Sequence, residues 1–149
     1  MSTHQQLLYH IVFSTKRRKR LLNDSIREDV FSYIAGVCKR LDGFPLEVGG
    51  YYDHAHLLVR IPARVAVSDF VGKIKSNTSK HLNEGKALGV PFGWQDGFGA
   101  FSVSPSNKDA VSRYIGGQME HHRKRTFEEE YLQLLLKHEV EFDERYVFD

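Results

Sequence analysis

The 149-residue sequence contains a single cysteine, only four prolines and no long hydrophobic run. Because a disulfide needs two cysteines, Cys38 cannot form an intrachain bridge, which favours a reducing, cytoplasmic setting. No apolar segment approaches the roughly 20 residues that span a bilayer, and the polar amino terminus does not resemble a signal peptide. We therefore expect a soluble, cytoplasmic protein with no membrane segment.

The size and the charge distribution limit the possible organisation and partners. At 149 residues and 41% hydrophobic content, the chain is long enough for one domain, residues 1–149, with a sizeable core. Residues 127–149 carry eight acidic and two basic side chains, a net charge of −6, so the total of +2 leaves +8 on residues 1–126. A basic body favours a polyanionic partner, whereas the acidic end is interpreted as the solvated surface of a last helix.

Hydrophobic periodicity predicts alternating strands and helices. The expected elements are a strand at 7–14, a helix at 23–41, a hairpin with strands at 46–52 and 54–61, a helix beginning at Ser68 and reaching 82, a strand at 98–104, and helices at 107–122 and 127–138. The first six match a ferredoxin-like, split βαβ arrangement. We predict an α+β fold whose antiparallel sheet has helices mainly on one face and a second face free for a ligand, with the C-terminal helices added.

Two histidines in the second hairpin strand are the most informative residues. Alternate side chains of a strand share one face, so His54 and His56 point the same way while Ala55 points into the core. Paired imidazoles at this spacing are typical of a metal site that awaits a third ligand. The alternative is that one histidine caps a turn and the other is a hydrogen-bonded core residue.

Basic clusters offer candidate contacts to a phosphate backbone. Five consecutive cations follow the first strand, where they form either a solvated loop or a phosphate clamp. Further cations lie on the predicted helix at 68–82 and after the helix at 107–122, with the same two interpretations. The candidate DNA-binding residues are Lys16, Arg17, Arg18, Lys19, Arg20, Lys73, Lys75 and Arg123.

A second group of polar residues follows in the predicted helix at 107–122. Tyr114 and Gln118 are four residues apart and therefore share one helical face, which His121 and His122 continue. The pair Gly116–Gly117 would cost about 1 kcal/mol per glycine inside a helix, so a close backbone approach or a hinge is expected there.

Taken together, these segments resemble the single-tyrosine HUH transposases of the insertion sequence 200/605 type. The resemblance rests on the segments YHIVFSTK at 9–16, DHAHLLV at 53–59, GWQ at 93–95, AFSVS at 100–104 and YIGGQ at 114–118. It implies that His54 and His56 bind a divalent metal, that Gln118 is the third ligand and that Tyr114 is the nucleophile. It also implies a homodimer that recognises single-stranded DNA hairpins. Ala55 departs from the bulky residue usual between the histidines, which affects packing rather than chemistry.

The implied chemistry is consistent with these residue types. A free tyrosine has a pKa near 10 and is only ~0.1% phenolate at neutral pH, so Tyr114 needs help from a metal such as Mg²⁺ or Mn²⁺. Attack on DNA would give a 5′-phosphotyrosine and a free 3′-hydroxyl. His121 and His122 are candidates for proton transfer, although contact with phosphate is an equal alternative. Asp53 is interpreted as a turn residue, with orientation of a ligating histidine as its other role.

Other functions are compatible with parts of the sequence. The chain could be a domesticated transposase acting on repeated chromosomal hairpins, or a replication initiator or relaxase with the same chemistry. A non-catalytic, ferredoxin-like module that binds single-stranded nucleic acid would use the histidines only for stacking or hydrogen bonds. A hydrolytic zinc enzyme is disfavoured because the sequence places no convincing carboxylate base near the histidine pair.

Overall fold

The structure, a computed structural model, describes residues 1–149. Four strands form one antiparallel sheet in the order β2-β3-β1-β4. This confirms the predicted α+β fold with an antiparallel sheet. The strands and helices are β1 (Leu8–Ser14), α1 (Arg27–Arg40), β2 (Phe44–Tyr51), β3 (His54–Arg60), α2 (Val67–Gly85), β4 (Gly99–Ser102), α3 (Lys108–Gly116), α4 (Gln118–His121) and α5 (Phe127–Lys137), with short 3-10 helices at Lys16–Arg18 and Pro105–Asn107.

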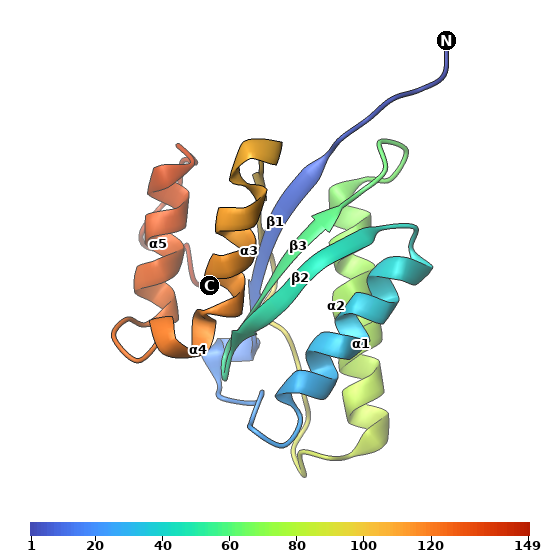
Figure 1. The fold of residues 1–149 in the computed structure, drawn as a ribbon. Helices are drawn as coiled ribbons and strands as arrows, with labels where there is room; N and C mark the ends of the chain where they lie inside the picture. The colour runs from blue at the N-terminus through green and yellow to red at the C-terminus, as the bar shows by residue number, and fades with distance from the viewer.

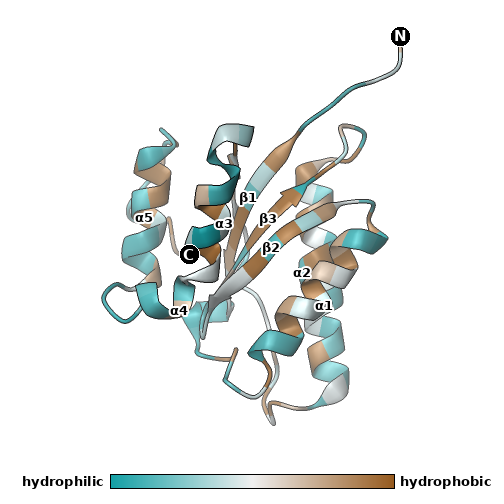
Figure 2. Cartoon of the chain, in the orientation of Figure 1, coloured by the Kyte–Doolittle hydropathy of each residue, from teal (hydrophilic) through white to brown (hydrophobic).

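Helices cover both faces of this sheet (Figure 1). On one face, Ile11, Leu57 and the other strand residues whose side chains point the same way pack against α1 and α2. Together they form the largest apolar cluster. On the other face α3 and α5 pack through two smaller clusters, which include Ile115 from α3 and Leu135 from α5. The expected free second face is therefore wrong, because α3 and α5 bury it through these clusters. Both helices carry apolar residues among polar ones (Figure 2).

Two details of the helices differ from the sequence-based expectation. The predicted helix at 107–122 is interrupted at Gly117, where backbone angles of φ −94° and ψ 12° end α3 before α4 begins. Ser68 lies within the first turn of α2 rather than at its N-cap, which is Ala66. The break lies between the helix that carries Tyr114 and the one that begins at Gln118.

Either a close backbone approach or a hinge was expected at the Gly116–Gly117 pair. The break at Gly117 agrees with the hinge, whereas the close backbone approach occurs in strand β2. A Cβ added to Gly116 would meet only Glu47 Oε1 at 3.7 Å, an ordinary contact. A Cβ added to Gly49 would lie 2.6 Å from the carbonyl oxygen of Ile115 in α3. The missing side chain at Gly49 therefore allows α3 to lie directly on the sheet.

The C-terminal tail packs back onto the protein, as its apolar composition predicts. Val147 and Phe148 contact the cluster formed by Val12, Phe101 and α5. The Arg18 guanidinium donates a hydrogen bond of 3.0 Å to the Phe148 carbonyl oxygen, which ties the tail to the first basic loop. None of the helices has both the length and the apolar character needed to cross a membrane.

Candidate metal and tyrosine centre

His54 and His56 lie on the sheet face that α3 and α5 cover, and both side chains are fully buried. His54 Nδ1 lies 2.7 Å from the Asp53 carboxylate, and His56 Nδ1 lies 2.7 Å from Nε2 of His10 on strand β1. Each ring is held from its Nδ1 side, which directs both Nε2 atoms toward the helices. Asp53 therefore orients a histidine as well as belonging to the turn.

Helices α3 and α4 bring the predicted tyrosine and glutamine to these histidines. Gln118 is buried, and its side-chain oxygen lies 2.9 Å from His54 Nε2. The half-buried Tyr114 ring lies with its centroid 5.7 Å from that of His56. The four residues predicted to form the site, His54, His56, Tyr114 and Gln118, therefore meet within a single chain.

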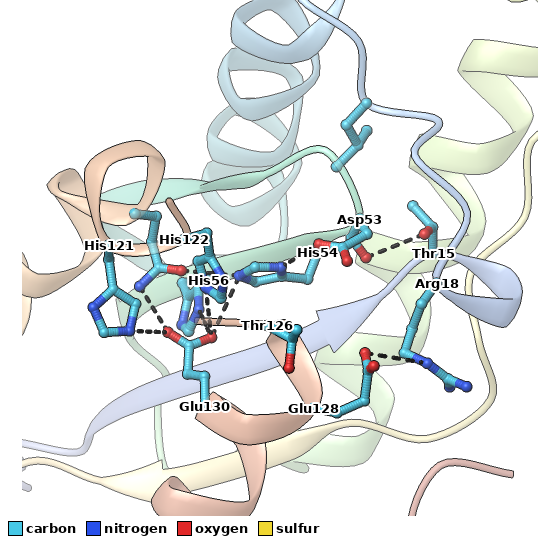
Figure 3. Close-up of polar contacts among 12 residues, drawn as sticks. Thr15, Arg18, Asp53, His54, His56, His121, His122, Thr126, Glu128 and Glu130 are labelled. Carbon is cyan, nitrogen blue, oxygen red and sulfur yellow. Dashed lines mark hydrogen bonds and ion pairs between the residues drawn. The ribbon is translucent and has the colours of Figure 1, made fainter. Parts of the chain in front are cut away.

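The residue at the middle of this site, Glu130 of α5, was not predicted (Figure 3). Its carboxylate is fully buried. Its Oε1 atom lies 3.1 Å from His56 Nε2, 3.4 Å from His54 Nε2 and 3.2 Å from His122 Nε2. The structure thus places a carboxylate beside the histidine pair, contrary to the expectation that none is near it.

The second carboxylate oxygen of Glu130 faces Tyr114 of α3 and Gln118 of α4. Glu130 Oε2 accepts a hydrogen bond of 2.9 Å from the Gln118 amide nitrogen and another from the Tyr114 hydroxyl. His121 Nε2 lies 3.5 Å from the same oxygen. Glu130 therefore links the histidine group to the tyrosine.

A helical-phase argument could have identified Glu130. Glu128, Glu129 and Glu130 are consecutive and look alike in the sequence, where all three suggest a solvated face. Only Glu130 is three residues after Phe127 and four before Leu134, so it shares their buried face. That signal places a carboxylate in the interior but does not show what it contacts.

The buried charges determine the protonation states in the metal-free chain. Burial alone would raise the pKa of the Glu130 carboxyl, but the surrounding imidazoles hold that pKa well below its usual range. Burial lowers the pKa of His54, yet its hydrogen bonds to Asp53 and Glu130 prevail and raise it to about 9. Burial and the negative Glu130 raise the pKa of Tyr114, so its phenol is protonated at neutral pH.

The basic residues divide between two layers of the molecule. A cleft of about 550 Å³ beside the site is lined by cations from the first loop and from the segment after α4, namely Arg17, Arg18, Arg20, Arg123, Lys124 and Arg125. Lys16 and Lys19 belong to the same loop without lining this cleft. Lys73 and Lys75 lie on α2, across the sheet, and the Lys75 ammonium donates to the carbonyl oxygens of Gln95 and Gly97 at 2.7 Å each.

The donor set suits a divalent metal. Ligand atoms of His54, His122 and Glu130 all lie within 4.8 Å of one another. His56 Nε2 and the Gln118 oxygen face the same space. Imidazole nitrogens with carboxylate and amide oxygens bind first-row divalent ions such as Mn²⁺, and the oxygens suit Mg²⁺ as well.

Known transposases resemble this chain in sequence. The transposases for insertion sequence element IS200 from Salmonella typhimurium and Salmonella typhi are each 36% identical to this chain over 76 residues. The match covers 51% of this chain and 50% of each relative, so the chain spans about half the length of the curated relatives it matches.

Two solved structures share the fold. A putative transposase from Deinococcus radiodurans has a TM-score of 0.63 at 19% identity, with 79% of this chain and 95% of that chain covered. A REP-associated tyrosine transposase bound to a REP hairpin has a TM-score of 0.60 at 17% identity, covering 82% and 74%. Residues 3–118 match the family model described as "Transposase IS200 like". Because this match includes most of the sequence and ends at Gln118, the chain belongs to the IS200-like transposase family.

Proposed function

We propose that this protein cleaves and rejoins single-stranded DNA through a covalent bond to Tyr114, with the help of a divalent metal. The observation that carries the proposal is the convergence of Tyr114, His54, His56 and Gln118 on one buried centre within one chain. Membership of a transposase family supports the reaction class. Transposition requires that DNA strands be cut and joined, and this centre offers both a nucleophile and metal ligands.

His54, His56 and Gln118 would hold the metal. When bound, Mg²⁺ or Mn²⁺ would polarise the scissile phosphate and neutralise the charge that develops there. The Tyr114 oxygen would attack phosphorus, forming a phosphotyrosine on the 5′ side and breaking the bond to the 3′ oxygen, which leaves as a hydroxyl. The nearest acceptor for the phenolic proton is Glu130, which already receives the Tyr114 hydrogen bond. His121, beside the same carboxylate, is the candidate that would pass this proton on to the leaving 3′ oxygen, so that it departs as a hydroxyl.

The clefts around the centre provide a path for a polyanion. A second cleft of about 540 Å³ is lined by Tyr114, His10 and Lys137, and Arg125 lines both clefts. Arg125 therefore places the cations of the first cleft next to the cleft that contains the tyrosine, and these cations are suited to contact phosphates of a DNA strand bound there. The structural neighbour bound to a REP hairpin supports a hairpin as the DNA partner. The homodimer implied by the sequence resemblance stays a prediction, and light scattering would test it.

A denaturing gel tests the covalent step directly. Purified protein is incubated with Mn²⁺ and labelled single-stranded hairpins from its own genomic flanks, and the wild type is compared with Tyr114→Phe. We expect an adduct that survives denaturation in the wild type and none in the variant, while gel-shift binding of the hairpin changes little. Tyr146→Phe is the matched control, because Tyr146 is exposed and distant in sequence from the centre.

Two results would contradict the proposal. An adduct that persists in Tyr114→Phe would show that another residue is the nucleophile. Tight hairpin binding with no adduct in the wild type, at any concentration of Mg²⁺ or Mn²⁺, would favour a non-catalytic binding module.

A further inference from the structure

We propose that Glu130 and His122 are ligands of the metal in this protein, so that helix α5 and the segment before it complete the metal site. Both residues lie beyond the family-matched region, which ends at residue 118. The proposal rests on the proposed function for the presence of a metal, but it concerns a different part of the chain.

The hydrogen-bond partners of the rings determine where their lone pairs point. His54 Nδ1 faces the Asp53 carboxylate at 2.7 Å, and His122 Nδ1 faces the Arg125 carbonyl oxygen at 2.7 Å. Both partners only accept hydrogen bonds, so each Nδ1 carries the ring proton. In the neutral rings, both Nε2 atoms therefore present lone pairs, and both are directed at Glu130 Oε1, from 3.4 and 3.2 Å.

Gln118 adds a further acceptor to the same space. Its amide nitrogen donates to Glu130 Oε2, which leaves its oxygen 2.9 Å from His54 Nε2. Four acceptor atoms thus converge, two imidazole nitrogens and two oxygens. If His54 Nε2 carries a proton, it can donate a hydrogen bond to the oxygens that it faces. His122 Nε2 still faces the carboxylate, and this buried nitrogen has no hydrogen-bond partner. A cation between these atoms satisfies all four.

The spacing and the charge of the group agree with this assignment. Neighbouring ligands of an octahedral ion with bonds of about 2.1 Å lie about 3.0 Å apart. The distances from Glu130 Oε1 to the three Nε2 atoms are 3.1 to 3.4 Å, close to that separation. A fully buried carboxylate is costly without a compensating charge. In the metal-free chain the protonated His54 supplies that charge, and a divalent ion bound here would take its place. Glu130 also contributes the anionic oxygen that Mg²⁺ and Mn²⁺ prefer.

Calorimetric titration of the full chain with Mn²⁺ tests the assignment without relying on DNA cleavage. Glu130→Gln keeps the shape of the side chain and removes its charge, and we expect it to weaken Mn²⁺ binding about tenfold or more. The matched control is Glu129→Gln, which changes the same chemistry at the adjacent exposed residue and should leave the affinity unchanged. His122→Gln should weaken binding as well.

A further variant separates this proposal from the proposed function. One result would overturn only the present proposal: the wild type binds Mn²⁺, His56→Ala binds it more weakly, and Glu130→Gln binds it as tightly as the wild type. In that case the protein has a metal site, but Glu130 is not one of its ligands. If the wild type binds no Mn²⁺, or if His56→Ala has no effect, the metal-dependent function itself fails. If circular dichroism shows that Glu130→Gln does not fold, His122→Gln decides the question. An unchanged affinity of His122→Gln for Mn²⁺ would overturn the proposal, and a weaker affinity would support it.

Discussion

At the scale of single residues, His10 is the support on which the orientation of His56 depends. Its Nε2 atom lies 2.7 Å from His56 Nδ1, and the two rings are stacked with centroids 5.0 Å apart. Burial holds the pKa of His10 well below its usual range, so the ring is neutral and can exchange a single hydrogen bond with His56. This contact fixes which nitrogen of His56 is available to a metal.

We expect His10→Leu to weaken Mn²⁺ binding about 10- to 100-fold, because His56 Nδ1 loses the partner that orients the ring. Calorimetric titration measures the effect, and His10→Gln should recover part of the affinity since an amide can replace the hydrogen bond. His81→Gln is the control, as His81 is exposed and stacks on Tyr33 of α1, on the opposite side of the sheet. Equal affinity in His10→Leu and the wild type would rule out this positioning role.

Residue patterns reveal only part of such a centre. Strand alternation was sufficient to place His54 and His56 on one face, because period two is a local property of the chain. The role of His10 depends on strand pairing, in which Val12 lies opposite His56 and His10 opposite Leu58. The sequence shows His10 only as a polar residue in an apolar strand, so its contact with His56 becomes visible once that register is known.

At the scale of secondary-structure elements, Gly49 determines how closely the tyrosine helix approaches the sheet. The carbonyl oxygen of Ile115 occupies the space that a side chain at this position would need. We expect Gly49→Ala to destabilise the protein by about 1 to 3 kcal/mol, the usual cost of overpacking, and to displace Tyr114 from the histidines. Urea denaturation gives the stability, and the adduct assay should show slower cleavage.

A second glycine provides the control for this substitution. Gly72 lies in α2 with open space around the site of an added Cβ. Gly72→Ala should therefore stabilise the helix by up to about 1 kcal/mol without changing cleavage. If Gly49→Ala were as stable and as active as the wild type, the close approach of α3 would not be a requirement of the site.

The sequence predicts where the strands and helices lie along the chain, but not how the C-terminal helices pack. Period and turn signals locate the four strands and the two helices of the first core within a few residues, because each pattern is local. The covered second face was missed, since an apolar stripe such as that of α5 shows that a helix is buried without showing against what. The position of Glu130 depends on the same docking of α5, which only the tertiary arrangement determines.

At the scale of the whole molecule, the positive charge beside the centre comes from two distant segments. The loop after β1 and the loop between α4 and α5 line one cleft, next to Tyr51 and His122. Several of the cations have intramolecular partners, such as Arg18 with Glu128 at 3.3 Å and Arg123 with Glu120 at 3.3 Å. Arg17 and Lys124 are exposed members of this cleft without such an ion pair.

Binding of single-stranded DNA should therefore depend on salt through this cleft. Removing one cation that neutralises a phosphate should reduce the slope of log K against log salt concentration by about 0.7. We expect Arg17→Ala and Lys124→Ala each to lower the slope by that amount in gel-shift titrations between low and high salt. Lys73→Ala removes an exposed cation from α2, across the sheet, and should leave the slope unchanged. A lower slope in Lys73→Ala, with none in the other two variants, would place the DNA on the α1 and α2 layer instead.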